Sequence, residues 1–354
     1  MRILVTGGAG FVGSSLALLM KRDRAGAEVV ALDNLKRRGS ELALARLRAG
    51  GVQFRHGDIR NPEDLDEAGR FDLLIECSAE PSVHAGYDGA ARYLVNTNLV
   101  GTINCLEVAR RHGAGVVFLS TSRVYPIAGL SALPLAAGAT RLELPPGAAG
   151  PGWSAAGIAE DFPLDGARSL YGATKLASEL IVEEYRAMYG LKAVVNRCGV
   201  IAGPWQMGKV DQGFIVLWAA RHVYGGRLSY IGYGGAGLQV RDVLHVADLH
   251  ELVERQVADL ERHAGPARNV GGGPEYSVSL AELTDLVVRA SGRRIEIGRD
   301  PETRAADIPW YVTDNARIAA AADWRPRRGT AELIDEVVRW LVDHRSVLEP
   351  VLGS

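Results

Sequence analysis

The stretch Ile3-Leu4-Val5-Thr6-Gly7-Gly8-Ala9-Gly10-Phe11-Val12-Gly13 decides the fold of this chain. Its apolar start predicts a strand, and the segment Ser14–Arg22 that follows predicts a helix. Between them, Gly7 permits a tight turn, Gly10 lets backbone N–H groups approach a pyrophosphate, and Gly13 lets the helix pack closely on the strand. The amino terminus of the helix adds a partial positive charge that favours phosphate groups. This strand–turn–helix therefore predicts a dinucleotide-binding site.

The alternation of strands and helices continues beyond this stretch. Apolar segments predict strands at Val29–Leu32, Val52–His56, Leu73–Cys77, Val116–Leu119 and Ala193–Arg197, and helical patterns occupy Tyr93–His112 and Tyr171–Gly190. Strands that alternate with helices pair in parallel, and right-handed crossovers place the helices on both faces of the sheet. The sequence therefore predicts an α/β fold with a Rossmann-type, doubly wound parallel sheet.

The later half of the chain mixes strands, glycine-rich turns and helices without this regularity. It predicts a smaller mixed α/β carboxyl-terminal lobe that binds substrate, with a last helix at about Ala331–His344. We expect residues 1–195 to form the Rossmann domain, with 238–272 returning to it, and residues 196–237 and 273–354 to form the substrate lobe. Residues 126–168 are rich in Gly, Ala and Pro and are too long for a routine connection, which predicts an insertion near the active site.

Asp33 bears on the choice of dinucleotide, because it closes the second predicted strand. A carboxylate there accepts hydrogen bonds from the adenosine ribose hydroxyls and repels a 2′-phosphate, which favours NAD. The nearby Arg37 and Arg38 leave open the alternative that they hold such a phosphate. The residues expected to contact the cofactor are Gly7, Gly10, Phe11, Val12, Gly13, Asp33, Asn34, Asp58, Ile59, Ala79, Asn98 and Lys175.

A candidate catalytic set is formed by Thr121, Tyr171 and Lys175. Tyr171 and Lys175 are four residues apart in a helical pattern, so their side chains share one face. Lys175 can lower the pKa of the phenol and hold a nicotinamide ribose hydroxyl, while Tyr171 exchanges a proton with a sugar hydroxyl. Thr121 follows the strand Val116–Leu119, at the sheet edge where active sites of doubly wound folds lie, and can bind the same substrate oxygen.

The composition excludes several classes of function. The 40 basic and 42 acidic residues nearly balance, which argues against a nucleic-acid partner. No apolar stretch is long enough to cross a bilayer, so we expect no membrane partner. The three cysteines are widely spaced and no histidine pair has zinc-ligand spacing, which favours reduced thiols, a cytoplasmic protein and no metal site.

These motifs together resemble the extended short-chain dehydrogenase/reductase family, in its branch of NAD-dependent nucleotide-sugar epimerases and dehydratases. The resemblance spans essentially the whole chain and depends on Gly7–Gly13, Asp33, Asp58, Thr121, Tyr171 and Lys175. It implies a nucleotide-diphosphate sugar (CDP or UDP) as substrate, with phosphate contacts from Arg241 and Arg304. It also implies a homodimer or homotetramer that associates through the helices at Tyr93–His112 and Tyr171–Gly190. The substrate-binding residues expected are Ser122, Arg123, Asn196, Gln206, Arg241 and Arg304.

Within this branch the chain is most similar to CDP-paratose (CDP-tyvelose) 2-epimerases. The likeness rests on the insertion, on Asp211-Gln212-Gly213 and on the segment Gln239–His245, whereas Cys198–Gly203 departs from the expected pattern and leaves the sugar open. Sugar 4,6-dehydratases carry an Asp-Glu pair after the threonine, where this chain has Ser122 and Arg123. Arg123 either pairs with a carboxylate of the insertion, such as Glu160 or Asp161, or recognises an acidic sugar.

The function predicted is that of an NAD-dependent epimerase that transiently oxidises a nucleotide-linked sugar at C2 or C4. Tyr171 removes the proton of the ring hydroxyl, the keto-sugar turns over, and reduction from the opposite face inverts the carbon. The alternatives are a 4-epimerase acting on a UDP-hexose or UDP-uronate, a nucleotide-sugar ketoreductase, and a non-catalytic NAD-binding scaffold. The complete Thr121, Tyr171 and Lys175 set argues against the scaffold.

Overall fold

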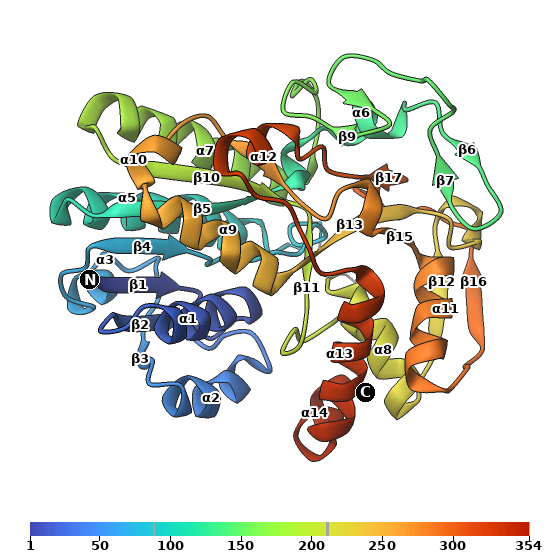
Figure 1. Cartoon of the computed structure of the whole chain (residues 1–354), viewed down its shortest axis with the longest axis horizontal. Coiled ribbons are helices and arrows are strands. Elements are labelled where there is room, and N and C mark those ends of the chain that lie inside the picture. The colour runs from blue at the N-terminus through green and yellow to red at the C-terminus, as the bar shows by residue number, and fades with distance from the viewer. Residues whose placement is uncertain (88, 210–211, 354) are drawn as a thin grey trace.

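The computed structural model describes residues 1–87, 89–209 and 212–353, so Asp211 of the segment 211–213 lies outside it. Figure 1 shows a parallel sheet covered by helices, with a second lobe beside it. Within the described residues this sheet has seven strands in the order β14-β10-β5-β4-β1-β2-β3, all parallel. They are β1 (Arg2–Thr6), β2 (Glu28–Asp33), β3 (Gln53–His56), β4 (Leu73–Glu76), β5 (Gly115–Thr121), β10 (Ala193–Cys198) and β14 (Arg268–Val270). The predicted doubly wound α/β fold is confirmed.

Both faces of the sheet are buried, because successive side chains of a strand point to opposite faces. Ile3 and Val5 of β1 pack with α1 (Phe11–Asp23), α2 (Ala43–Ala49) and α9 (Val246–Ala258). Leu4 packs on the other face with α3 (Pro62–Glu67), α5 (Gly101–His112) and α7 (Ser169–Tyr189). The helical stretch predicted at Tyr93–His112 consists of α4 (Ala91–Val95), a π-helical turn η2 (Asn96–Val100) and α5.

The second lobe is built around β13 (Val240–His245), which pairs with β11 (Val200–Ala202), β15 (Ser277–Ser279) and β17 (Trp310–Tyr311). A separate parallel pair joins β12 (Leu228–Ile231) to β16 (Ile297–Asp300). The core of this lobe lies between α8 (Phe214–Tyr224), α11 (Leu280–Ser291) and α13 (Thr330–Asp343). α13 fits the helix predicted at about Ala331–His344, but it is not the last one, because α14 (Arg345–Leu352) follows and buries Leu348 and Leu352. Short helical elements elsewhere in the chain are η1 (Ser40–Leu42), η3 (Ser122–Val124), η4 (Tyr233–Gly235), α10 (Leu260–His263), η5 (Pro274–Tyr276) and α12 (Ala316–Ala322).

Residues 126–168 form a long excursion that packs on the second lobe. It contains α6 (Ile127–Ser131) and the short strands β6 (Ala136–Ala137), β7 (Leu142–Glu143), β8 (Trp153–Ser154) and β9 (Gly157–Ile158). Ile158 and Phe162 are buried against Tyr311 and Val312, which accounts for its attachment there. In Figure 1 the excursion lies beside β15 and β17. The structure describes all of its residues, and none of them lines the central cavity discussed below.

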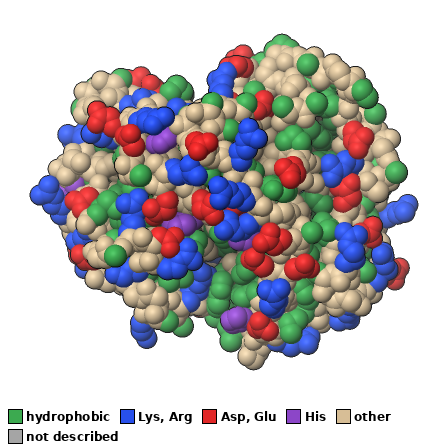
Figure 2. All heavy atoms as spheres, viewed as in Figure 1, with side chains coloured by type: hydrophobic (Ala, Val, Ile, Leu, Met, Phe, Trp, Pro, Cys, Tyr) green, Lys and Arg blue, Asp and Glu red, His purple; other side chains and the backbone are tan. Residues whose placement is uncertain are grey.

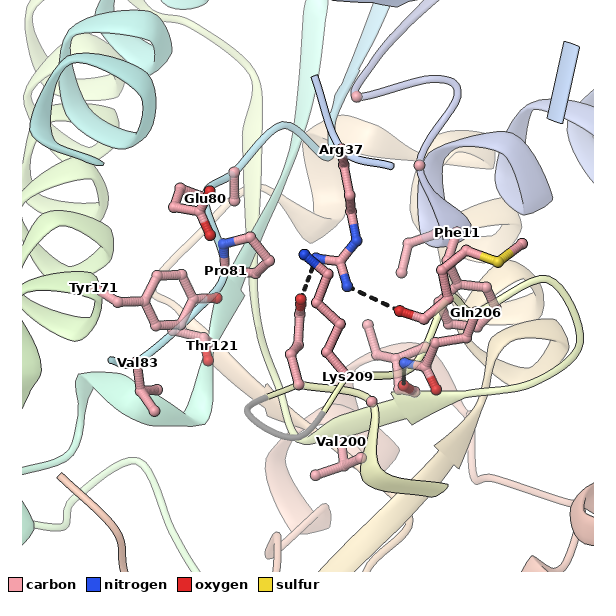
Figure 3. Close-up of a pocket in the computed structure, with 18 of the residues that line it drawn as sticks. Phe11, Arg37, Glu80, Pro81, Val83, Thr121, Tyr171, Val200, Gln206 and Lys209 are labelled. Carbon is pink, nitrogen blue, oxygen red and sulfur yellow. Dashed lines mark hydrogen bonds between the residues drawn. The ribbon is translucent and has the colours of Figure 1, made fainter. Parts of the chain in front are cut away.

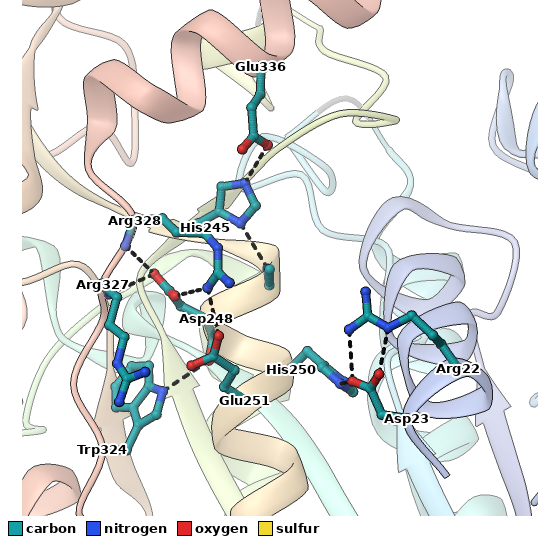
Figure 4. Close-up of polar contacts among 11 residues, drawn as sticks. Arg22, Asp23, His245, Asp248, His250, Glu251, Trp324, Arg327, Arg328 and Glu336 are labelled. Carbon is teal, nitrogen blue, oxygen red and sulfur yellow. Dashed lines mark hydrogen bonds and ion pairs between the residues drawn. The ribbon is translucent and has the colours of Figure 1, made fainter. Parts of the chain in front are cut away.

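Helix α9 connects the two lobes through polar contacts (Figure 4). On the side of α1, His250 Nε2 lies 2.8 Å from Asp23 Oδ2. On the side of the second lobe, the buried carboxylate of Asp248 accepts the backbone N–H groups of Arg327 and Arg328 at 3.0 and 2.9 Å. A buried carboxylate requires such donors, so these contacts fix the chain segment that leads into α13 relative to the large sheet.

The surface carries charges of both signs. Figure 2 shows acidic and basic side chains interspersed over the face seen in Figure 1, in keeping with a net charge of −2. Within the part of the chain that the structure describes, none of the helices combines the length and apolar character needed to cross a membrane.

Candidate functional site

A cavity of about 1060 Å³ lies between the two lobes. Its wall includes residues at or just after the carboxyl ends of five parallel strands of the large sheet, namely Gly7, Asp33, Cys77, Thr121 and Cys198. In open parallel sheets this edge is where ligands bind. The other wall comes from the second lobe, so the cavity can hold two ligands side by side, one on each lobe.

The glycine turn after β1 has the geometry of a pyrophosphate site. Gly7 adopts a φ of +62°, which favours glycine, and its carbonyl accepts the N–H of Gly10 at 3.0 Å. A Cβ on Gly13 would lie 2.2 Å from the carbonyl oxygen of Gly7, so only glycine lets α1 start this close to the turn. Both glycines line the cavity at the amino terminus of α1. The structure therefore confirms the predicted position of this turn.

The carboxyl end of β2 fits an adenosine ribose. The Asp33 carboxylate lines the cavity and accepts the N–H groups of Ala9 and Leu35 at 3.0 and 2.8 Å, while burial raises its pKa. Arg37 and Arg38 both line the cavity, but their guanidinium groups are engaged by the protein. Arg37 donates to the carbonyl of Met207 at 3.0 Å and to the Gln212 side chain (Figure 3), and Arg38 donates to the carbonyl of Pro350 at 2.9 Å. This arrangement fits NAD rather than NADP.

The predicted cofactor residues, apart from Asn98, all line the cavity. Burial raises the pKa of Asp58, but hydrogen bonds from Arg60 and Asn34 outweigh this effect and lower the pKa to about 2. Its carboxylate is therefore charged at neutral pH. The residues that line the cavity as expected are Gly7, Gly10, Phe11, Val12, Gly13, Asp33, Asn34, Asp58, Ile59, Ala79 and Lys175.

Asn98 is a correction, because it does not reach the cavity. Its side chain is fully buried, where it accepts the N–H of Glu80 at 2.8 Å and donates to the carbonyl of Glu80 at 3.1 Å. It also donates to Thr174 Oγ1 at 3.3 Å. The asparagine therefore joins the loop after β4 to α7, and the neighbouring Thr97 lines the cavity instead.

Tyr171 and Thr121 lie next to each other at the centre of the cavity, with Pro81 and Val83 nearby (Figure 3). Burial raises the pKa of Tyr171 to about 12, while a hydrogen bond with Thr121 and the charge on Arg123 oppose the rise. Thr121 is positioned by η3, whose first turn it caps by accepting the N–H of Arg123 at 3.2 Å. The two side chains can share one substrate oxygen, as the sequence predicts, and their catalytic role stays a prediction.

Lys175 lines the same cavity, and it has a partner that the sequence reasoning missed. Its Nζ lies 3.8 Å from Glu76 Oε2 at the end of β4 and 4.0 Å from the centre of the Phe118 ring. Both charged groups are almost fully buried, and burial lowers the pKa of Lys175 while the charge on Glu76 opposes this change. The signal available in the sequence was a carboxylate inside the apolar segment Leu73–Cys77.

Five of the predicted substrate residues line the cavity: Ser122 and Arg123 directly follow β5 of the large sheet, whereas Gln206, Arg241 and Arg304 belong to the second lobe. Arg304 is exposed, whereas Arg241 is held in place by Asp307 at 3.1 Å. Gln206 donates to the carbonyl of Ile201 at 3.0 Å, and its side-chain oxygen has no partner among the described residues.

Asn196 is the second correction. Its side chain is fully buried and exchanges two hydrogen bonds with Gln256 of α9, at 2.9 and 2.8 Å, so it holds β10 to α9 rather than contacting substrate. The adjacent Arg197 pairs with Glu179 of α7 at 2.8 Å and is likewise structural. The strand end was identified correctly, but these two side chains point into the protein.

Arg123 does not pair with the insertion. Glu160 and Asp161 instead form ion pairs with Arg317, while the guanidinium of Arg123 donates to the carbonyl of Ala306 at 3.1 Å. Among the described residues no carboxylate lies within 4 Å of Arg123, which corrects the first of the two interpretations of this residue.

Comparisons with known proteins agree with this geometry. The family described as NAD dependent epimerase/dehydratase matches residues 3–271. A CDP-paratose 2-epimerase from Salmonella typhi is 29% identical over 96% of this chain and 99% of that protein. A dTDP-glucose 4,6-dehydratase from Streptomyces niveus is 30% identical over 99% of this chain and 96% of that protein.

A solved structure gives the same result. The UDP-glucose 4-epimerase of Thermus thermophilus, in complex with NAD, has a TM-score of 0.77 and 28% identity, covering 97% of this chain and 99% of that one. The chain is thus an enzyme whose cofactor is NAD, and its glycine turn, Asp33 and the central cavity fit that cofactor. It belongs to the NAD-dependent epimerase/dehydratase family.

Proposed function

We propose that this enzyme is a nucleotide-sugar epimerase that inverts C2 of the sugar by transient oxidation, as the similarity to a CDP-paratose 2-epimerase suggests. The observation that carries the proposal is the placement of Thr121, Tyr171 and Lys175 in one cavity beside the glycine turn. Ser122 and Arg123, which directly follow Thr121, supply no acid–base pair for the loss of water. This favours an epimerase over a dehydratase, although dehydratases are equally similar in sequence.

In this mechanism Tyr171 acts as the base that takes the proton of the sugar hydroxyl. Thr121 holds the same oxygen, so it keeps the hydroxyl aligned with the phenol. Lys175 orients the nicotinamide ribose. Its ammonium group and the carboxylate of Glu76 also determine the electrostatic environment of the tyrosine. The glycine turn, Asp33 and Lys175 would hold NAD⁺, which would supply reversible hydride exchange with the sugar carbon. Tyr171 then gives the proton back to the oxygen.

Inversion requires a firmly held nucleotide and a loosely held sugar. Arg241 and Arg304 offer charged contacts on the second lobe, whereas the side chains of Pro81 and Val83 beside Tyr171 offer no hydrogen bonds (Figure 3). Apolar side chains at these two positions leave part of the wall without polar anchors for the keto-sugar, although Glu80 and His84 of the same loop also line the cavity. The same residues would also serve a 4-epimerase acting on a UDP-hexose or UDP-uronate, and that is the second candidate.

We further propose that the enzyme is a homodimer that associates through α5 and α7. Leu180 and Met188 on α7 are 63% and 65% exposed, and Val100, directly before α5, is 41% exposed. Large apolar side chains that gather on neighbouring helices are typical of an interface. A second copy of the same face would bury them.

The test is to denature the purified protein, without added cofactor, and to quantify the released nicotinamide nucleotides by chromatography. An epimerase regenerates its cofactor in every cycle, so we expect near-stoichiometric NAD(H), and turnover of a CDP- or UDP-hexose without added NAD. Tyr171→Phe should lower kcat by about 10²- to 10⁴-fold with unchanged NAD content. An empty protein that prefers NADPH would instead indicate a ketoreductase, and full turnover by Tyr171→Phe would refute the mechanism.

A further inference from the structure

Two arginines lie close together in the cavity, and their bonding differs. Arg241 donates to the carbonyls of Val240 and Ile308 at 2.8 and 2.6 Å and pairs with Asp307 at 3.1 Å. Its charge is therefore compensated within the protein. Arg123 donates to the carbonyl of Ala306 and has no carboxylate within 4 Å among the described residues. A guanidinium has five N–H donors, so most of those on Arg123 are available to a ligand in the cavity.

A cation that is buried without an anion is costly. Burial and the nearby charge of Arg241 lower the pKa of Arg123 to about 10, while the charge of Asp307, which is paired with Arg241, opposes the change, so the side chain is still charged at neutral pH. The side chain lines the cavity wall and remains partly accessible from the cavity. An anionic group of the substrate would remove this cost, which makes Arg123 the better candidate for a direct contact than the already paired Arg241.

The position of Arg123 ties that anion to the reacting hydroxyl. Its backbone N–H is bonded to Thr121 Oγ1 at 3.2 Å, and its carbonyl is so close to Gly172 that a Cβ there would lie 2.1 Å away. The residue is thus fixed between Thr121 and the turn of α7 that carries Tyr171. Its charge also acts on the phenol of Tyr171. An anion bound to Arg123 therefore lies beside the oxygen on which Tyr171 acts.

The covalent structure of a nucleoside diphosphate sugar limits what this anion can be. The β-phosphate is attached through oxygen to C1, and C2 is the next ring atom, whereas C4 lies across the ring from C1. A neutral sugar that reacts at C2 therefore brings a phosphate close to the reacting hydroxyl. A sugar that reacts at C4 brings an anion there only if it is a uronate, whose carboxylate is attached at C5. A diphosphate carries two negative charges, so it can engage Arg123 and also the exposed Arg304 that lines the same cavity, which a single carboxylate does less well.

We propose that Arg123 binds an oxygen of the substrate's β-phosphate and thereby presents C2, rather than C4, to Tyr171. This inference rests on the proposed function, since it assigns the carbon within that reaction. Arg123 is on this account a specificity-determining residue that links the diphosphate site to the catalytic tyrosine. Arg304 at the cavity rim and Arg241 behind it complete the positive wall.

The experiment compares the affinities of variants for nucleotides and needs no catalytic turnover. The affinities of the NAD-bound enzyme for CDP and CMP, and for UDP and UMP, are measured by calorimetry for the wild type, Arg123→Met and Arg123→Lys. Loss of a charge-assisted contact to the β-phosphate should lower the affinity for CDP by at least about 30-fold and leave that for CMP nearly unchanged. Arg123→Lys should recover part of the loss. Arg299→Met, which removes an exposed arginine outside the cavity, is the control and should change neither affinity.

Each alternative has a distinct outcome. Equal losses for CDP and CMP, or no loss for either, would overturn the assignment, because a merely structural role does not depend on the β-phosphate. If Arg123→Met weakens UDP-glucuronate relative to UDP-glucose while the CDP-to-CMP ratio is unchanged, the anion is the sugar carboxylate and the proposal is wrong. Inversion of a neutral hexose at C4, seen by NMR of the product, would also refute it. Failure of the epimerase proposal itself would appear separately, in the NAD content and in the turnover.

Discussion

The reactivity of Tyr171 depends on the charges that surround it. Glu76 raises the pKa of Tyr171 and also raises that of Lys175, whereas Arg123 lowers the pKa of the phenol. Tyr171 acts as a base only when deprotonated, and Lys175 contributes a positive charge only when protonated. The pKa values of both groups are therefore set in part by a carboxylate that does not touch the substrate.

Glu76→Gln should move the whole pH–activity profile to lower pH, by about one unit. Removal of the negative charge lowers the pKa of Tyr171 and also lowers the pKa of Lys175, so both limbs of the profile shift in the same direction. The measurement is kcat/KM against pH with the wild type in parallel. Glu76→Asp keeps the charge and should keep the profile, and an unshifted profile for Glu76→Gln would show that Glu76 does not act on these groups.

Loops at the ends of strands, rather than the strands themselves, close the cofactor site. The loop after β2 carries Arg37 and Arg38, which reach across to Met207 and Pro350 on the second lobe. A Cβ on Gly39 would lie 2.7 Å from the side chain of Met207, so the same loop is in tight contact with that lobe. These contacts cover one end of the cavity and should slow the escape of the cofactor.

Arg37→Met should therefore increase the rate of NAD loss by about tenfold, the effect expected from removal of about 1.4 kcal/mol of interaction across the cavity. The rate can be measured by dilution into an NAD-scavenging enzyme system. Arg48→Met, which removes an exposed arginine outside the cavity, is the control. An unchanged rate for Arg37→Met would mean that the loop does not limit cofactor exchange.

In the whole molecule, contacts between the two lobes determine the shape of the cavity, whereas the outer surface determines association with a second copy of the chain in our proposal. α9 fixes the lobes to each other through Asp248 and His250 (Figure 4), which defines the width of the cavity. On the large-sheet lobe, α5 and α7 bury their inner faces against the strands, and apolar side chains are exposed at Leu180 and Met188 of α7 and at Val100, directly before α5. That outer face is the surface that we assign to dimerisation.

Leu180→Asp should convert the proposed dimer to a monomer, because a buried unpaired carboxylate is disfavoured at an apolar interface. Light scattering after size exclusion should give about twice the chain mass of 37.9 kDa for the wild type and the single mass for the variant, with dimer affinity reduced by about 100-fold or more. Val342→Asp, at a 57% exposed position on α13, is the matched control and should remain dimeric. A monomeric wild type would rule out the interface.

Features that depend on neighbours in the chain could be predicted from the sequence. The glycines at 7, 10 and 13 require a particular local backbone, and Asp33 follows the second strand directly. Tyr171 and Lys175 share a face because the helix period places them there. Parallel pairing then brings the strand ends to one edge, so Thr121 could be placed beside them. These statements needed only local periodicity and the rules for doubly wound sheets.

Features that depend on distant partners were decided by the tertiary structure. Asn196 and Asn98 are residues of a type that often binds ligands. A buried amide must, however, form hydrogen bonds, and the partners of these two are Gln256 and Glu80. Glu76 was found only when packing placed it against Lys175. Arg123 is a similar case, because only the folded chain shows that Asp307 pairs with Arg241 and that no carboxylate among the described residues forms an ion pair with Arg123. Sequence alone thus determined the fold and predicted the positions of Thr121, Tyr171 and Lys175 in one site, whereas long-range pairing of buried polar groups decided which side chains remain available to bind a ligand.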